Sequence, residues 1–153
     1  MRMNYFSASP AGLKAMLDLQ QHVHKAAQEG ELGNGLLALV YTRVSQINGC
    51  AYCIDMHTKD ARKAGETEQR LYALSAWRET PFYTERERAA LAWAEANTLL
   101  ASQNGIEDSL YEATREHFSE KGLTDLTLAI CTINAWNRLS ISFAADAGSY
   151  QPT

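Results

Sequence analysis

The spacing of the apolar residues constrains this chain more than any other feature, because one period persists almost throughout. Apolar side chains recur at three- and four-residue intervals, which place them on one face of a helix. No segment shows the alternation of apolar and polar residues that is typical of a half-buried strand. The sequence therefore predicts an all-α protein. Turn residues divide it into about six to seven helices, in these ranges: 10–30, 32–47, 51–64, 67–77, 84–103, 106–118 and 124–147.

Local signals set several of these helix limits. Ser9-Pro10 supplies an N-cap followed by a proline at the first helical position. Thr84 to Glu87 has the pattern of a capping box. Gly122 is expected to break the chain before the last helix. The segment 124–147 is apolar on most sides, so we expect it to be buried and to contact another subunit.

The segment from Asn48 to His57 is the part of the chain best suited to chemistry. Asn48-Gly49 is a turn dipeptide, so a helix is expected to begin near Cys50. On that helix Cys50, Cys53 and His57 follow the three-and-four spacing of one face. The Cβ atom of His57 should then lie about 5–6 Å from that of Cys53.

This placement favours thiol redox chemistry. The unpaired N–H groups and the dipole of a helix N-terminus stabilise a thiolate, and can lower a cysteine pKa from about 8.5 into roughly the 3.5–7.5 range. His57 can accept the proton of the Cys53 thiol or donate a proton to a leaving group. Cys50 can resolve an oxidised Cys53 into an intramolecular disulfide. We interpret the segment as a redox centre without a bound metal.

Two other interpretations of the cysteines stay open. They could be two buried cysteines that share a helix face by chance. Alternatively Cys50, Cys53 and His57 could hold zinc with Cys131 as a remote fourth ligand. No second Cys-x-x-Cys pair follows at the spacing of a zinc ribbon or finger, and Cys131 is expected to be a core thiol. A thioredoxin-like site is excluded, because no strand precedes Asn48.

Outside this segment, two groups of polar residues allow alternative roles. The stretch Asn134–Arg138 is expected to form a hydrogen-bond network at an interface, or else to line the site. Arg43 and Gln46 are expected to support the turn before the cysteines, or else to hold the thiolate. We assign three histidines to the surface and three tryptophans to packing: His22, His24 and His117, and Trp77, Trp93 and Trp136.

Length and charge limit the class of protein. The 153 residues correspond to one domain, which we assign to residues 1–153. A net charge of −4 without a basic stripe argues against nucleic acid or an anionic membrane as a partner. Residues 1–12 contain no apolar signal segment, and no apolar run approaches the roughly 20 residues of a membrane span. We therefore expect a cytoplasmic protein, where paired cysteines are usually catalytic or metal-binding.

The motif resembles that of a known family. Arg43-x-Ser45-Gln46-x-Asn48-Gly49-Cys50-x-x-Cys53-x-x-x-His57 is similar to the motif of the AhpD-like alkylhydroperoxidases, in the carboxymuconolactone decarboxylase superfamily. Residues 85–91, 127–130 and 133–138 also resemble the later helices of this family, so the similarity extends over most of the chain from Leu36 to Phe143.

The resemblance implies an all-α fold that forms trimers or hexamers through helix packing. It implies thiol peroxidase or disulfide reductase activity without a cofactor. Cys53 would attack the peroxide, Cys50 would resolve the product, and His57 would belong to the proton relay. A dithiol, in some members a lipoylated protein, would reduce the enzyme again. A non-enzymatic oligomer that responds to redox state is the alternative.

Two positions depart from the better-studied peroxidases of the family. Those enzymes carry a glutamate twelve positions before the first cysteine, where this chain has Ala38. Some also have a histidine just before the second cysteine, where this chain has Tyr52. Loss of the carboxylate is expected to weaken the base, since acid–base help is worth roughly 10²–10⁴-fold. The decarboxylase branch fits less well, because its members do not depend on a Cys-x-x-Cys pair.

Overall fold

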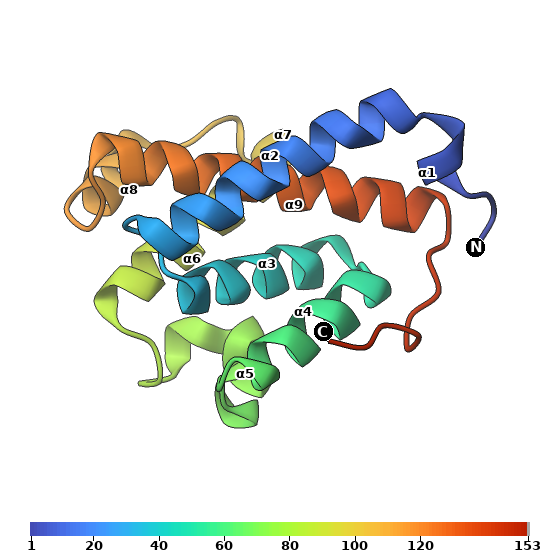
Figure 1. Cartoon of the computed structure of the whole chain (residues 1–153). Helices are drawn as coiled ribbons and strands as arrows, with labels where there is room; N and C mark the ends of the chain where they lie inside the picture. The colour runs from blue at the N-terminus through green and yellow to red at the C-terminus, as the bar shows by residue number, and fades with distance from the viewer. Residues whose placement is uncertain (153) are drawn as a thin grey trace.

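Helices account for all of the regular secondary structure in the computed structural model, which describes residues 1–152 (Figure 1). These residues contain no strand, which confirms the predicted all-α class. None of the helices that they form is long and apolar enough to cross a membrane. In chain order the elements are α1 (Tyr5–Ala8), α2 (Pro10–Glu29), α3 (Asn34–Asn48), α4 (Ala51–Lys63), α5 (Glu68–Ala73), the 3₁₀ helix η1 (Leu74–Glu79), α6 (Glu85–Thr98), α7 (Leu100–Gln103), α8 (Asp108–Arg115) and α9 (Glu120–Ser142).

Two of the predicted helices are divided in the structure. The segment predicted at 67–77 is α5 followed by η1, and the backbone leaves the helical conformation at Ala76 (φ −118°, ψ 29°). The segment predicted at 84–103 is divided at Leu99 into α6 and α7. The capping box from Thr84 to Glu87 is present, with both of its reciprocal hydrogen bonds. Capping is local, and so it could be read from the sequence.

The prediction for Gly122 was wrong, because this residue lies inside the first turn of α9. Ser119 is the N-cap of the helix, and its hydroxyl accepts a hydrogen bond from the Gly122 N–H at 3.0 Å. The carboxylate of Glu31 folds over the same turn and accepts from the Ser119 N–H at 3.0 Å. A Cβ atom at Gly122 would lie 2.1 Å from Glu31 Oε2. The glycine therefore provides space for a carboxylate and does not end a helix.

The central helix of the fold is α3. It packs against α4, α6 and α9, while α2 lies along α9 on the other side of the molecule from α4 and α5 (Figure 1). The helix that carries the cysteines is therefore held mainly against α3. Apolar side chains of α3, α6 and α9 form the main core, among them Val40, Val44, Ala90, Ala94, Leu126, Ile130 and Ile133.

Only part of α9 is buried, although its sequence is apolar on most sides. Leu126, Ile130 and Ile133 face the core, whereas Ile141 is 46% exposed. Cys131 is also exposed, so the prediction of a core thiol was wrong. Its neighbours along the helix point inward, and the helical rotation of about 100° per residue turns Cys131 outward.

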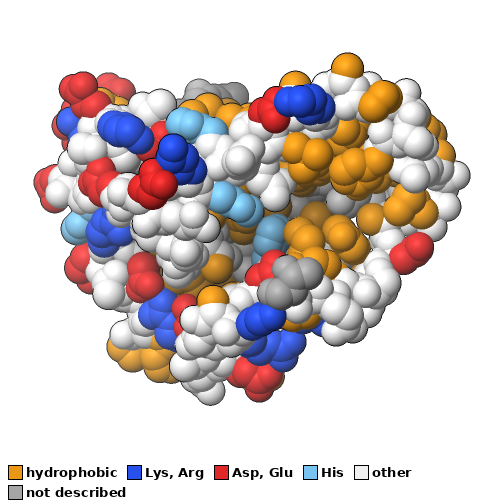
Figure 2. All heavy atoms as spheres, in the orientation of Figure 1, with side chains coloured by type: hydrophobic (Ala, Val, Ile, Leu, Met, Phe, Trp, Pro, Cys, Tyr) orange, Lys and Arg blue, Asp and Glu red, His pale blue; other side chains and the backbone are white. Residues whose placement is uncertain are grey.

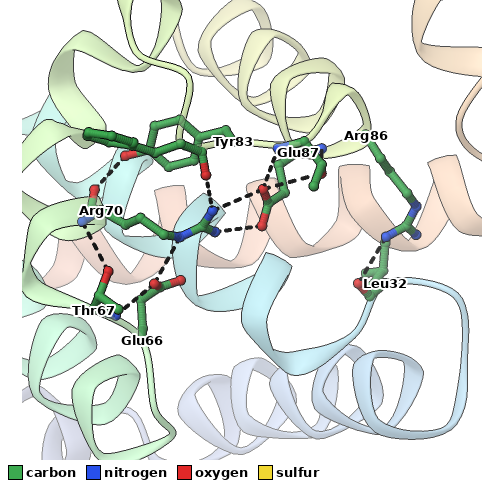
Figure 3. Close-up of polar contacts among 9 residues, drawn as sticks. Leu32, Glu66, Thr67, Arg70, Tyr83, Arg86 and Glu87 are labelled. Carbon is green, nitrogen blue, oxygen red and sulfur yellow. Dashed lines mark hydrogen bonds and ion pairs between the residues drawn. The ribbon is translucent and has the colours of Figure 1, made fainter.

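An ion-pair cluster joins the segment after α4 to the start of α6. The guanidinium of Arg70 on α5 donates to Glu66 at 2.9 Å and to Glu87 at 2.6 Å, as Figure 3 shows. The Tyr83 hydroxyl donates to the backbone oxygen of Arg70 in the same view. These contacts fix α5 beside the start of α6.

Candidate functional site

A tight turn connects α3 to the helix that carries the cysteines. Gly49 has φ 69°, a left-handed conformation that costs glycine little and other residues more. Its N–H donates to Gln46 O at 3.2 Å, and the Cys50 N–H donates to Ser45 O at 3.0 Å. Cys50 is then the N-cap of α4. The structure confirms the predicted turn and the helix start beside Cys50.

Asparagine side chains from α9 hold this turn in place. Asn48 Nδ2 donates to Asn134 Oδ1 at 3.0 Å and to Asn137 Oδ1 at 2.9 Å. Asn137 is fully buried, and its own Nδ2 donates to Ser45 Oγ at 3.1 Å. The polar stretch of α9 thus forms a hydrogen-bond network, although the predicted role placed that network at an interface. The network lies within one chain and binds α9 to the end of α3.

Cys50 and Cys53 are joined by a disulfide, with 5.3 Å between their Cα atoms. Each residue is 1% exposed. The Cys53 N–H donates to Cys50 Sγ at 3.4 Å, as an N3 amide does to an N-cap side chain. The helix N-terminus therefore acts most directly on the sulfur of Cys50.

Cys53 lines a cavity of about 200 Å³ between α1, α2, α3, α4 and α9. Figure 2 shows the molecule hollowed on this side, with hydrophobic side chains gathered in the hollow and histidines at its edge. No charged side chain is among the described residues that line the cavity. These are Tyr5, Phe6, Leu17, Gln20, Tyr41, Tyr52, Cys53, Met56, His57, Trp136 and Ser140.

His57 lines the same cavity, so the structure brings two predicted site residues together. Its ring packs edge-on against Tyr41, with 5.0 Å between the centroids. Its Nε2 atom is buried and has no hydrogen-bond partner among residues 1–152. Burial lowers the pKa of His57 to about 4, and the neighbouring His24 contributes to the decrease. The imidazole is therefore uncharged at neutral pH while Cys53 is in the disulfide.

The motif did not reveal two other residues of the cavity, Tyr41 and Trp136. The Tyr41 hydroxyl and the Trp136 Nε1 atom are buried and lack partners within the described chain. Burial raises the pKa of Tyr41 well above its ordinary value, so its hydroxyl keeps its proton. Tyr41 lies four residues after Leu37 and three before Val44, so the apolar stripe could have shown its burial. Trp136 packs against the core as predicted, and in addition lines the cavity.

Arg43 points to a different part of the fold. Its Nε donates to Glu95 at 2.7 Å and its Nη1 to Gln46 at 3.3 Å. Glu95 also accepts from Trp77 Nε1 at 2.9 Å and from Arg78. Burial alone would raise the pKa of Glu95, but these hydrogen bonds and charges outweigh it and hold the pKa below its usual value. Arg43 therefore has a structural role, but it joins α3 to Glu95 on α6, whereas the predicted structural role was to support the turn before the cysteines.

Comparison with known families gives this arrangement a context. The model of the carboxymuconolactone decarboxylase family matches residues 10–96, which include the whole cysteine motif. The chain belongs to this family. The match ends before α9, so Asn134, Asn137 and Trp136, which complete the site, lie outside the matched segment.

Relatives of the chain agree with this assignment. The uncharacterised Bacillus subtilis protein YdfG is 45% identical over 148 residues, which cover 97% of each chain. An Agrobacterium tumefaciens protein of unknown function is 40% identical and is described as a candidate AhpD antioxidant defence protein. Its crystal structure matches this chain with a TM-score of 0.89, over 97% of this chain and 99% of its own. The debrominase Bmp8 shares the fold, with 19% identity and a TM-score of 0.82 over 94% of this chain and 75% of its own. The predicted family resemblance is confirmed.

Ala38 stands where the family resemblance leads us to expect a glutamate. This residue lies half-buried on α3, and no carboxylate is found among the described residues that line the cavity. The ring of His57 is held in place by packing against Tyr41.

The zinc interpretation requires ligands that the fold does not bring together. Within residues 1–152, no group of three or more His, Cys, Asp or Glu side chains is arranged to hold a metal ion. Cys131, the fourth ligand in that interpretation, is exposed on α9.

Proposed function

We propose that this protein is a thiol peroxidase that reduces organic hydroperoxides with Cys53 and Cys50 and is recycled by an external dithiol. One observation carries the proposal. A buried disulfide lies at the start of α4, and its Cys53 end lines an apolar cavity together with the uncharged His57. Membership of a family that includes AhpD-like proteins is consistent with this chemistry.

The reductive half of the cycle begins at Cys53, because this cysteine is the one that lines the cavity. A thiolate of the reductant attacks Cys53 Sγ, the S–S bond breaks, and Cys50 leaves as a thiolate. The Cys53 N–H and the α4 N-terminus stabilise that charge, which makes Cys50 the better leaving group. The second thiol of the reductant then attacks the mixed disulfide, which releases Cys53 and the oxidised reductant.

The oxidative half uses His57 to move one proton. The neutral imidazole accepts the proton of the Cys53 thiol, and the thiolate sulfur attacks the terminal oxygen of the hydroperoxide. An S–O bond forms, the O–O bond breaks, and the departing alkoxide takes the proton from the imidazolium to leave as an alcohol. Cys53 is now a sulfenic acid. The Cys50 thiol attacks its sulfur, which restores the disulfide and releases water.

The reductant and the assembly belong to the same proposal. Cys50 and Cys53 are each 1% exposed, so a slender dithiol reaches the disulfide more easily than the surface of a folded partner does. A dihydrolipoyl arm on a lipoylated protein has this form. We also retain the trimeric or hexameric assembly and the cytoplasmic location as proposals.

Variants of the three cysteines test this function. We expect the wild type to consume cumene hydroperoxide with dihydrolipoamide as reductant, and Cys53→Ser to lose this turnover completely. Cys50→Ser should stop after one reaction, with a sulfenic acid on Cys53 that dimedone traps and mass spectrometry detects. Cys131→Ser is the matched control, because this exposed thiol is outside the cavity. Full peroxidase activity in Cys53→Ser, or none in the wild type, would contradict the proposal.

A further inference from the structure

Three buried polar atoms without a partner are concentrated at one place in the described chain. They are the Tyr41 hydroxyl, His57 Nε2 and Trp136 Nε1, and all three residues line the cavity beside Cys53. Buried polar groups in folded proteins almost always have a hydrogen-bond partner, and an unmade bond is costly. A molecule that enters the cavity and supplies a partner would remove this cost.

The chemistry of these atoms defines what that molecule must offer. The indole N–H of Trp136 can only donate a hydrogen bond. The Tyr41 hydroxyl keeps its proton, because burial raises its pKa, and so it can donate as well. His57 is needed for proton transfer in the cycle proposed above. Both of the other groups are donors without a partner on residues that line the same cavity, and the acceptor that would satisfy them is most simply an oxygen atom in an organic molecule.

The remainder of the cavity defines the size and charge of the molecule. Aromatic rings form much of the wall, with Tyr5 stacked on Phe6 at 4.8 Å and Phe6 on Trp136 at 6.1 Å. The volume of about 200 Å³ holds one substituted ring, since an apolar cavity of roughly 150 Å³ accepts benzene. No lining residue in the described chain carries a charge, so a buried anion would lack a compensating cation.

We propose that this cavity binds an uncharged organic molecule of about the size of one aromatic ring, through an oxygen that accepts hydrogen bonds from the Tyr41 hydroxyl and the Trp136 N–H. This identification rests on the peroxidase function proposed above: the oxygen bound by the two donors is the one that leaves with the alcohol when the O–O bond breaks. As the bond breaks, negative charge develops on it, and two preformed donors stabilise that charge. Tyr41 and Trp136 would thus supply stabilisation at a site that has no carboxylate.

Binding of the alcohol product tests the site without any turnover. We expect 2-phenyl-2-propanol, the alcohol formed from cumene hydroperoxide, to bind the oxidised wild type in isothermal titration calorimetry, and benzoate of similar size not to bind. Tyr41→Phe and Trp136→Phe should each weaken binding of the alcohol roughly 3- to 10-fold, which is the usual effect of one hydrogen bond. Tyr72→Phe is the control, because Tyr72 is 70% exposed outside the cavity. Unchanged binding in Tyr41→Phe, or tighter binding of benzoate than of the alcohol, would overturn the assignment.

Kinetics then separate the role of Tyr41 from a general effect on the fold. Tyr41→Phe should slow the reaction with cumene hydroperoxide more than that with perbenzoic acid, whose departing oxygen is stabilised by its own carbonyl group. The rate of Cys53 alkylation by iodoacetamide should not change, since no oxygen departs. Equal losses with both peroxides would overturn the role of Tyr41. If the alcohol binds through Tyr41 but the wild type reduces no peroxide, the proposed function fails and the binding site stands.

Discussion

The buried imidazole of His57 should make the stability of the oxidised protein depend on pH in a defined direction. Its pKa is about 4 in the folded protein, against 6.5 for an ordinary histidine. Between these values the unfolded chain binds a proton that the folded protein does not bind. The free energy of unfolding therefore falls as the pH decreases from about 6.5 to 4, and the contribution of His57 to it is constant above about pH 7.

The size of the effect follows from the two pKa values. A difference of about 2.5 pH units, at about 1.4 kcal/mol per unit, gives a loss of up to about 3.5 kcal/mol in the free energy of unfolding. His24 faces the same region, and its pKa is also lowered, by burial that outweighs the charge of Asp60. Protonation of His24 would further oppose a charge on His57.

Urea unfolding at several pH values between 4.5 and 7.5, followed by circular dichroism without reductant, measures this loss. His57→Gln provides the reference, because glutamine does not titrate and the other ionisable groups stay the same. As the pH decreases, the free energy of unfolding should fall more steeply for the wild type than for the variant. Curves that stay parallel within about 0.5 kcal/mol would show that His57 is not held uncharged by burial.

Reduction of the disulfide extends this prediction. In the oxidised protein Cys53 carries no charge, whereas a thiolate at the same position would favour the imidazolium of His57. The pKa of His57 should therefore rise when the disulfide is reduced, which NMR titration of the ring can follow. The same pKa in both redox states would mean that the imidazole and the sulfur do not interact, and would remove the basis of the proton transfer.

Two further substitutions test how the fold supports the site. Gly122→Ala should destabilise the protein by up to about 1 kcal/mol, because the new Cβ displaces the Glu31 carboxylate from its hydrogen bonds at the start of α9 and this outweighs the gain in helix propensity. Gly35→Ala is the control, because a Cβ there meets no atom within 4 Å, and it should be neutral or stabilising in the same thermal denaturation. Similar effects of the two substitutions would argue against the Glu31 contact. Asn137→Leu should cost about 2–4 kcal/mol, since it leaves the buried Ser45 hydroxyl and the turn before the cysteines without their partner. A folded variant with wild-type stability and wild-type Cys53 alkylation rate would show that the network does not position the turn.

Local features of the site could be predicted because they depend on neighbouring residues. The Asn48-Gly49 turn, the start of α4 at Cys50 and the capping box at Thr84 all follow from side chains within three or four positions of one another. The periodicity that places Cys53 and His57 on one face is equally local. These interactions form whichever way the helices pack, and so the all-α class and the positions of the motif were visible in the sequence.

Packing between distant helices decided the features that the sequence did not predict. Gly122 was misread because the carboxylate that needs its space comes from Glu31, in the segment between α2 and α3. Cys131 is exposed because α9 turns only one face to the core. Tyr41 and Trp136 meet at the cavity only after α3 and α9 have packed together. The low pKa of His57 arises from the same packing, since desolvation depends on every element around the ring. The sequence by itself determined which groups could react, and the tertiary structure decided which of them are buried, uncharged and without a partner beside Cys53.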